Sequence, residues 1–495
     1  MFNKSTVRAI SLYLDKAESN IYRVIESTEK KEYYHPSSAQ KRLYILQQVD
    51  LENTSYNLPK LVVLEGKADL EKLNNTFRKL IERHEILRTS FEIIEDGPVQ
   101  RIQPEAAFAV EYFEVENREE IEKILKDFIR AFDLSKAPLV RTGVIKIDEV
   151  RYILMVDLHH IITDRKSHEV LVQDFITLFE KREFPGLRLQ YKDFSEWQTS
   201  LKRNRSIKQQ EKYWLKVCED APTLIMPIDF SRPAIQSFEG DTVHFTLEKQ
   251  ESNALKKIAL EEGITIYMLF LAIFNVLLSK ICRQQDIVVG TPVSSRRHAD
   301  LEKIIGMFVN TLALRNYPQG EKRFKDFLKE VKERTLEAFE NQDYPFEFLV
   351  NKLKTHRDIS RNPLFDVMFS FIELNGQILE KSETLSHLSN VNHINHLNHD
   401  AQGKQMTFKF ENNVSRFDLT LTVVKIGEDF FFDIIYRTKL FNKETIEKLV
   451  SSFKNLVSCV IENPENKISG IKLISKAERD EILVDSFVDL EAEYA

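Results

Sequence analysis

The sequence predicts a mixed α/β protein with two lobes, and three observations support this prediction. The chain has 495 residues, whereas a single hydrophobic core stops growing near about 250–300 residues. Patterns typical of helices and of strands alternate in both halves of the chain, as they do in layered α/β domains. The composition, 42% hydrophobic and 30% charged, is that of a globular protein. We therefore expect two α/β sandwiches.

Charge and cysteine content argue against several functional classes. The formal net charge of -7 leaves no basic surface for a nucleic acid or an acidic membrane. The three cysteines lie far apart without a CxxC pair, which argues against a disulfide framework or a zinc site and fits a reducing, cytoplasmic setting. The most apolar run, residues 266–278, is too short to span a bilayer and is typical of a buried helix. The N-terminus has no apolar core of the signal-peptide type.

The first half of the chain contains one segment that is well placed for chemistry. Residues 1–34 combine a short apolar patch with a charged stretch and are expected to be peripheral. A helix should begin after Asp69, a suitable N-cap, because apolar residues then recur at helical spacing. Residues 151–158 predict an apolar strand, and a helix should follow near Ser167. The loop between them, residues 159–165, lies where a rigid scaffold can aim side chains.

The second half repeats the mixture of helices and strands. A charged, polar stretch around residues 200–212 predicts the boundary between the subdomains. The elements expected after it are helices near 250–262 and 265–281, a strand at 286–290, a helix at 324–339, strands near 406–424 and 428–437, and a helix at 443–460. Four histidines cluster within residues 387–399, where an exposed polar loop is favoured over a metal site.

Two adjacent histidines are the best candidates for proton transfer, because imidazole titrates near neutral pH. His159 and His160 lie on an extended segment, so their side chains should point to opposite faces and only one can face a given cleft. Asp164 precedes the predicted helix and is placed to accept backbone N–H groups or to pair with a cation. Taken alone, a histidine pair is more often structural than catalytic, and this pattern leaves both alternatives open.

Seven short motifs together carry a family resemblance. Together they span residues 38–364 of the chain. They are SAQKRLY at 38–44, RHEILRTSF at 83–91, HHIITD at 159–164, YKDFSEW at 191–197, IGMFVNT at 305–311, QDYPFE at 342–347 and RDISRNPL at 357–364. The set resembles the condensation domains of nonribosomal peptide synthetases, which belong to the chloramphenicol-acetyltransferase-like superfamily.

The resemblance implies a V-shaped pseudo-dimer of two chloramphenicol-acetyltransferase-like α/β sandwich lobes with a tunnel between them. It implies a carrier-protein tail and linker at residues 1–34, an N-terminal lobe at 35–205, a C-terminal lobe at 206–475 and a linker toward an adenylation domain at 476–495. The expected partners are an upstream donor carrier, a downstream acceptor carrier and the adjacent adenylation domain. Their 4'-phosphopantetheine arms would enter the tunnel as substrates, with no cofactor or metal bound by the domain itself.

The resemblance also implies roles for individual residues. His160 is expected to position the attacking amine or to accept its proton, with His159 and Asp164 structural. Asp164 is expected to pair with Arg296 of the other lobe. Arg165 stands where the family motif has glycine, and it is expected to line the tunnel together with Ser167 and Asn310. Trp197 and Asn310 are expected to be structural rather than catalytic.

The implied activity is peptide-bond formation, with an L-configured donor favoured, by an excised domain that we expect to be monomeric. A heterocyclisation domain would replace the histidine pair by an aspartate-based motif. An epimerisation-type domain shares the pair, but the IGMFVNT and QDYPFE segments resemble condensation domains. Three alternatives stay open: a catalytically weakened carrier-docking scaffold in which Arg165 blocks the tunnel, an epimerisation-type domain, and an acyltransferase that uses free coenzyme A thioesters.

Overall fold

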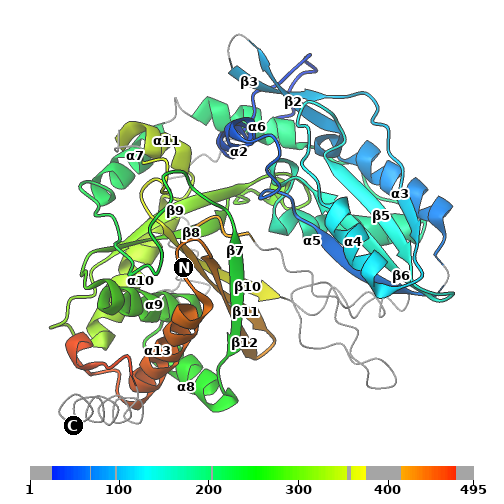
Figure 1. Cartoon of the computed structure of the whole chain (residues 1–495). Coiled ribbons are helices and arrows are strands. Elements are labelled where there is room, and N and C mark those ends of the chain that lie inside the picture. Colours follow the sequence, from blue (N-terminus) through cyan, green and yellow to red (C-terminus); the bar gives the residue numbers. More distant parts are fainter. Residues whose placement is uncertain are drawn as a thin grey trace, which may run out of the picture.

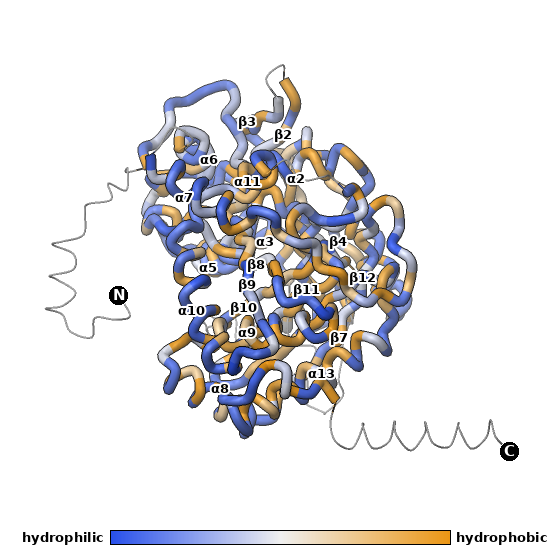
Figure 2. The backbone as a smooth tube through the Cα atoms, turned by 90° about the vertical axis from the view of Figure 1, so that its left-hand side faces the viewer, coloured by the Kyte–Doolittle hydropathy of each residue, from blue (hydrophilic) through white to orange (hydrophobic). Residues whose placement is uncertain are grey.

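The computed structural model describes residues 25–66, 68–94, 97–201, 205–353, 358–374 and 414–474. These residues fold into two α/β lobes that lie side by side and form a V (Figure 1). Hydrophobic segments gather inside each lobe, and the outer helices carry many hydrophilic residues (Figure 2). The expected carrier tail up to residue 24, the histidine-rich segment 387–399, the part of the predicted strand before 414, and the linker at 476–495 lie outside the described residues.

The first lobe contains a four-stranded sheet in the order β1-β6-β5-β4. Its strands are β1 (Lys60–Glu65), β4 (Glu111–Glu114), β5 (Val140–Lys146) and β6 (Arg151–Leu158). The central strand β6 runs antiparallel to β1 and β5, whereas β4 runs parallel to β5. A separate antiparallel hairpin is formed by β2 (Thr89–Ile94) and β3 (Gly97–Ile102). The strand predicted at 151–158 therefore lies at the centre of the lobe.

Helices cover both faces of this sheet. They are α2 (Ser38–Val49), α3 (Leu70–Arg83), α4 (Arg118–Phe128), α5 (Arg165–Phe179) and α6 (Tyr191–Ser200). Leu125 and Phe128 of α4 pack with Met155 of β6 in one cluster, while α3 and α5 contribute to the larger cluster. The predicted cap of α3 is confirmed, because the Asp69 side chain accepts a hydrogen bond from the Lys72 N–H.

The second lobe contains a six-stranded sheet in the order β7-β12-β11-β10-β8-β9. Its strands are β7 (Gly240–Thr246), β8 (Ile287–Ser294), β9 (Val309–Asn316), β10 (Val367–Leu374), β11 (Leu419–Ile426) and β12 (Asp429–Arg437). Strand β10 lies between two parallel neighbours, β8 and β11, and the other pairs are antiparallel. The mixed sheet agrees with the predicted alternation of helices and strands.

The helices of the second lobe pack on this sheet. They are α7 (Arg205–Val217), α8 (Lys249–Glu261), α9 (Ile266–Cys282), α10 (Phe324–Glu340), α11 (Phe346–Leu353) and α13 (Lys443–Glu462). Every residue of α9 from Met268 to Ser279 is buried, which confirms the buried helix predicted there. Within the described residues no single helix could cross a membrane; α8 and α9 reach the necessary length and apolarity only as a pair, with a 106° bend between them.

Two segments depart from the expected division of the chain. Residues 25–34 were expected to be peripheral linker, but Ile25 and Tyr34 are buried in the first lobe and Tyr34 bridges Gln100 of β3. The packing of the first lobe thus begins before residue 35. In addition, residues 301–308 follow β8 of the second lobe in the sequence but belong to the hydrophobic cluster of the first lobe. This second segment connects the two lobes next to the histidine loop, because it hydrogen-bonds Asp164 and Ser167 of the first lobe.

Candidate active site

The candidate site is the short loop that joins the central strand β6 to α5. The backbone leaves β6 in an extended conformation at His159 and then makes one 3-10 turn, η2 (His160–Ile162). His159 is therefore extended as predicted, whereas His160 already belongs to the turn and not to the extended segment on which the sequence placed it. The His159 side chain is completely buried, whereas His160 is partly exposed.

His159 supports the loop from inside the first lobe. Its Nδ1 accepts a hydrogen bond from the Ile161 N–H at 3.1 Å, so the proton of the neutral ring lies on Nε2. The ring packs near the rings of Tyr56 and Phe132. Burial, with a smaller contribution from neighbouring cations, lowers its pKa to about 3. A neutral, buried imidazole in this position serves to hold the turn.

His160 combines partial exposure with an environment that disfavours its charged form. Its Nδ1 lies 2.7 Å from the carbonyl oxygen of Thr163, and because a carbonyl only accepts, the ring proton lies on Nδ1. The Nε2 lone pair is therefore unprotonated, and no residue in the described part of the chain hydrogen-bonds it. Burial, followed by the positive charge of Arg416, lowers the pKa of His160 to about 4. At neutral pH this ring can accept a proton or hold an amine.

Asp164 closes the loop and begins α5. One carboxylate oxygen accepts from the Ser167 N–H at 2.7 Å, which makes Asp164 the N-cap of the helix. The other oxygen accepts from the Phe308 N–H of the second lobe at 3.0 Å. The first oxygen also lies 3.2 Å from a guanidinium nitrogen of Arg296, so the ion pair expected between the lobes is present.

Both terminal nitrogens of the Arg296 guanidinium are hydrogen-bonded at the lobe interface. Beyond Asp164, it donates to the Leu301 carbonyl at 2.5 Å, to the Ile304 carbonyl at 2.6 Å and to the Ser167 hydroxyl at 2.7 Å. Its guanidinium also lies 3.8 Å above the ring of Phe308. This side chain organises the segment 301–308 that enters the first lobe.

Ser167 and Asn310, which the resemblance predicts to line a tunnel, are both buried and hydrogen-bonded within the protein. The Ser167 hydroxyl is fully buried and lies within hydrogen-bond distance of Asp164 and of the Gly306 backbone. The Asn310 amide donates to the carbonyls of Gln342 and Tyr344. The hydrogen bonds of both side chains are internal, and a tunnel-lining role for either residue stays a prediction.

Arg165 is the one departure from the motif, and the backbone accommodates it. It is the first residue of α5 and does not belong to the residues with positive φ, so its position needs no glycine. The side chain is 39% exposed and ion-pairs weakly with Glu169 at 3.8 Å. One guanidinium nitrogen lies 3.5 Å from the Glu373 carbonyl on β10. Arg165 thus extends from the first lobe to the second, beside the histidine loop.

Two features of the site were not identified from the sequence. Gly306 packs so closely on α6 that an added Cβ would lie 1.8 Å from the Tyr191 ring; the glycine of the IGMFVNT motif was the available signal. Arg416, from the second lobe, reaches the loop beside His160 and hydrogen-bonds the Ser55 carbonyl at 2.8 Å. An isolated arginine before a strand carries no recognisable signal.

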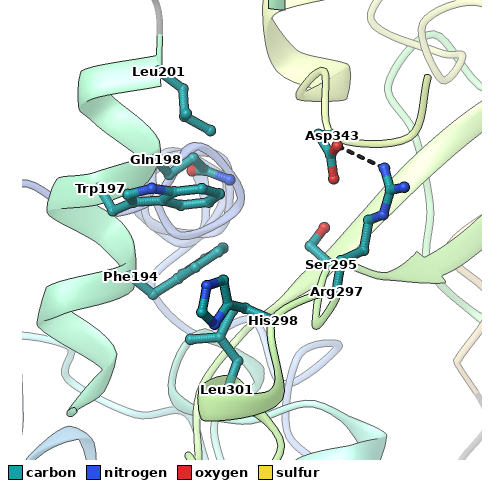
Figure 3. Close-up of a pocket in the computed structure, with 9 residues that line it drawn as sticks. All are labelled: Phe194, Trp197, Gln198, Leu201, Ser295, Arg297, His298, Leu301 and Asp343. Carbon is teal, nitrogen blue, oxygen red and sulfur yellow. Dashed lines mark hydrogen bonds and ion pairs between the residues drawn. The ribbon is translucent and has the colours of Figure 1, made fainter. Parts of the chain in front are cut away.

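A separate pocket lies on the α6 side of the lobe interface (Figure 3). Trp197 lines it from α6 and Asp343 faces it from the second lobe, where Asp343 accepts from Arg297 at 2.8 Å. His160 is not among the residues that line this pocket, and a structural role for Trp197 stays a prediction.

Comparison with known proteins supports the family resemblance. The condensation-domain family profile matches residues 30–483. Gramicidin S synthase 2 of Brevibacillus brevis is 42% identical over 495 residues, which is 100% of this chain but 11% of the synthase. This chain therefore spans about a tenth of that relative.

Solved structures show the same fold. The X-domain in complex with OxyB from teicoplanin biosynthesis has a TM-score of 0.80 at 23% identity, covering 91% of this chain and 98% of that one. The first condensation domain of the calcium-dependent antibiotic synthetase, solved with a substrate analogue, has a TM-score of 0.68 at 15% identity, covering 90% of this chain and 100% of that one. The V-shaped α/β fold predicted for the chain is confirmed, and the chain belongs to the condensation-domain family of nonribosomal peptide synthetases, whose members form amide bonds.

Proposed function

We propose that this chain joins a donor aminoacyl or peptidyl thioester to an acceptor aminoacyl thioester, each carried on the phosphopantetheine arm of a carrier protein. The acceptor amine attacks the donor carbonyl carbon, a C–N bond forms, the C–S bond breaks, and the proton lost by the amine goes to the departing thiolate. The observation that carries the proposal is the free Nε2 lone pair of His160, in a partly exposed ring between the lobes.

The histidine loop suits a reaction that depends on positioning. A thioester is already activated, so holding the amine close and correctly oriented can supply several kcal/mol, up to about 7–11 kcal/mol in ideal cases. The hydrogen bond from Nδ1 to Thr163 fixes the ring, and its low pKa of about 4 keeps Nε2 unprotonated at neutral pH. We propose that Nε2 holds the attacking amine or accepts its proton, with the two arms entering from opposite sides of a tunnel between the lobes.

The finer assignments follow from this proposal. We expect an L-configured donor, a donor carrier upstream, an acceptor carrier and an adenylation domain downstream, and a cytoplasmic location. The division into residues 1–34, 35–205, 206–475 and 476–495 belongs to the same proposal, with residues 25–34 packed on the first lobe. The match to Gramicidin S synthase 2, which covers all of this chain but 11% of the synthase, supports this arrangement of partners.

The direct test is a transfer assay between a loaded donor carrier and a loaded acceptor carrier, read by mass spectrometry. We expect His160→Ala to slow product formation about a hundredfold or more, in line with loss of a general base or positioning group. His244→Ala, which removes a 43% exposed histidine of the edge strand β7 that pairs with Asp433, is the matched control and should retain the rate. Product formation by His160→Ala at the wild-type rate would exclude the assigned role.

The donor configuration is tested in the same assay. Donor carriers loaded with the L- or the D-form of one amino acid are compared at equal concentration. We expect the L-form to be transferred faster, and a preference for the D-form would refute that part of the proposal.

One structural observation favours a second candidate, the weakened docking scaffold. Arg165 extends across the interface to Glu373 on β10, beside the proposed path of an arm. In that case the domain would bind loaded carriers but form no peptide product, and shortening the Arg165 side chain would restore peptide transfer.

A further inference from the structure

Arg416 is a second-lobe residue whose side chain is bound to the first lobe. It lies just before β11, and its guanidinium donates two hydrogen bonds to the Ser55 carbonyl, from Nε at 3.2 Å and from a terminal nitrogen at 2.8 Å. The same guanidinium lies 4.8 Å from the ring centroid of Tyr56. Two hydrogen bonds to one carbonyl, together with an aromatic contact, fix both the position and the plane of the group.

The segment that Arg416 holds is the one that anchors His160. The Tyr56 carbonyl accepts the His160 N–H at 2.8 Å, and the next residue, Asn57, bridges His159. The Tyr56 ring also lies near the His159 ring, with centroids 6.5 Å apart. A shift of residues 55–57 would therefore move the backbone from which the His160 imidazole projects.

The backbone of Arg416 is itself fixed in the second lobe. Its carbonyl accepts from Arg437 at 2.8 Å and from the Asn362 amide at 3.1 Å. Arg437 in turn forms a buried ion pair with Asp418 at 2.9 Å. A buried ionic network is costly to rearrange once one partner moves, so the network presents the Arg416 guanidinium at a defined place.

Arg416 is the main cation near His160. Asp164 acts in the opposite direction on the pKa of His160, and neutral His159 is its neighbour in the chain. Arg42 of α2 and the Tyr56 hydroxyl act on Arg416 itself. Among the residues that the structure describes, no carboxylate lies within ion-pair distance of Arg416, so its charge acts on the two histidines.

We propose that Arg416 is a positioning residue for condensation, which holds residues 55–57 across the lobe interface and thereby fixes the place of the His160 imidazole. This inference rests on the proposed role of His160. It predicts that loss of the Arg416 side chain changes the maximal transfer rate and the pKa of His160. The affinity for the donor carrier should stay unchanged.

The test compares Arg416→Met and Arg416→Lys with the wild type in the carrier transfer assay across about pH 5.5–9. Arg416→Met should lower the maximal rate about 10- to 100-fold, the effect expected of a small misplacement in a site, while the donor concentration at half-maximal rate stays within about twofold. NMR of the histidine side chains should show the pKa of His160 rising from about 4 toward its ordinary 6.5, because a nearby cation is lost. The rate of this variant should consequently begin to fall at a higher pH than that of the wild type as the pH is lowered.

Arg416→Lys separates charge from placement. Lysine keeps the cation but loses the fork that binds Ser55, so the titration of His160 should stay near that of the wild type while the rate falls about tenfold. If Arg416→Met does not fold, the lysine variant decides, and a wild-type rate for it overturns the proposal. Arg315→Met is the control, since that arginine makes comparable contacts to Asp286 and to backbone carbonyls within the second lobe; its loss should leave the His160 titration unchanged.

The outcomes distinguish this inference from the proposed function. If His160→Ala transfers at the wild-type rate, the proposed role of His160 fails, whatever Arg416 does. If His160→Ala is inactive but Arg416→Met transfers within about twofold of the wild type, or slows with an unchanged pH profile and an unchanged His160 titration, the positioning role of Arg416 fails alone.

Discussion

The carboxylate of Asp164 and the guanidinium of Arg296 lie 3.2 Å apart although they come from different lobes, and both side chains are almost fully buried. The same carboxylate caps α5 and accepts the Phe308 N–H. One residue thus ends the histidine loop, begins the next helix and holds the second lobe against both.

Replacing Asp164 should therefore lower the free energy of unfolding by more than the loss of an ordinary helix cap does. Asp164→Ala leaves Arg296 as an uncompensated buried charge, for which a loss of about 3–5 kcal/mol in the free energy of unfolding is typical. Asp69→Ala, which removes an exposed cap of the same type from α3, should cost about 1 kcal/mol. Urea unfolding of the two variants measures the difference. Equal losses would show that the pair between the lobes adds nothing to the cap.

Gly306 should tolerate no side chain while Tyr191 remains in place. A Cβ at this position would lie 1.8 Å from the Tyr191 ring, whose hydroxyl is tied to the Met307 carbonyl at 2.5 Å, so the ring cannot simply swing away. Gly306→Ala should destabilise the protein by about 1–3 kcal/mol, as overpacking does. Gly186→Ala is the control, because nothing lies within 4 Å of its added Cβ. Partial recovery in the double variant with Tyr191→Leu would identify the contact, and its absence would count against this explanation.

The outline of the site could be predicted because the signals are local. The cap at Asp164 follows from its place before an apolar helix, whereas the 3-10 turn that begins at His160 was not predicted. Predicting Arg296 as the partner required the resemblance to a family. Ser167 looked accessible in the sequence, yet its hydroxyl is buried by residues that pack from the other lobe.

The remaining contacts depend on how two lobes dock, which no local pattern encodes. The approach of Tyr191 to Gly306 and the reach of Arg416 to Ser55 join residues far apart in the sequence. Ile25 ends a short apolar run and is followed by the charged stretch from Glu26, so periodicity gave no indication that it is fully buried in the first lobe.

His159 should make the free energy of unfolding depend on pH. Its pKa is lowered to about 3 in the folded chain, while an unfolded histidine titrates near 6.5. As the pH falls from about 6.5 to about 3, this histidine binds a proton in the unfolded state but not in the folded state. Its contribution therefore lowers the free energy of unfolding by about 1.4 kcal/mol per pH unit. Asp157, whose pKa burial raises to about 7, acts in the opposite direction and remains in every variant.

A substitution isolates that contribution. His159→Asn keeps an acceptor for the Ile161 N–H but does not titrate, so the slope of the unfolding free energy between about pH 4 and 6 should become shallower by about 1.4 kcal/mol per pH unit. His244→Asn serves as the control, because that ring is 43% exposed and pairs with Asp433. An unchanged slope in His159→Asn would mean that the buried ring is charged in the folded chain.

Arg165→Gly separates an active condensation domain from a blocked one. Because Arg165 occupies a right-handed helical position, glycine offers it no conformational relief, and its single contact with Glu373 is long and partly exposed. We expect the transfer rate to stay within about threefold of the wild type, with a stability loss below about 1 kcal/mol from the lower helix propensity of glycine. Lys166→Gly, at the next and more exposed helical position, controls for that propensity. A gain in rate of about tenfold or more for Arg165→Gly alone would correspond to about 1.4 kcal/mol of barrier removed and would identify the arginine as an obstruction to the entering arm.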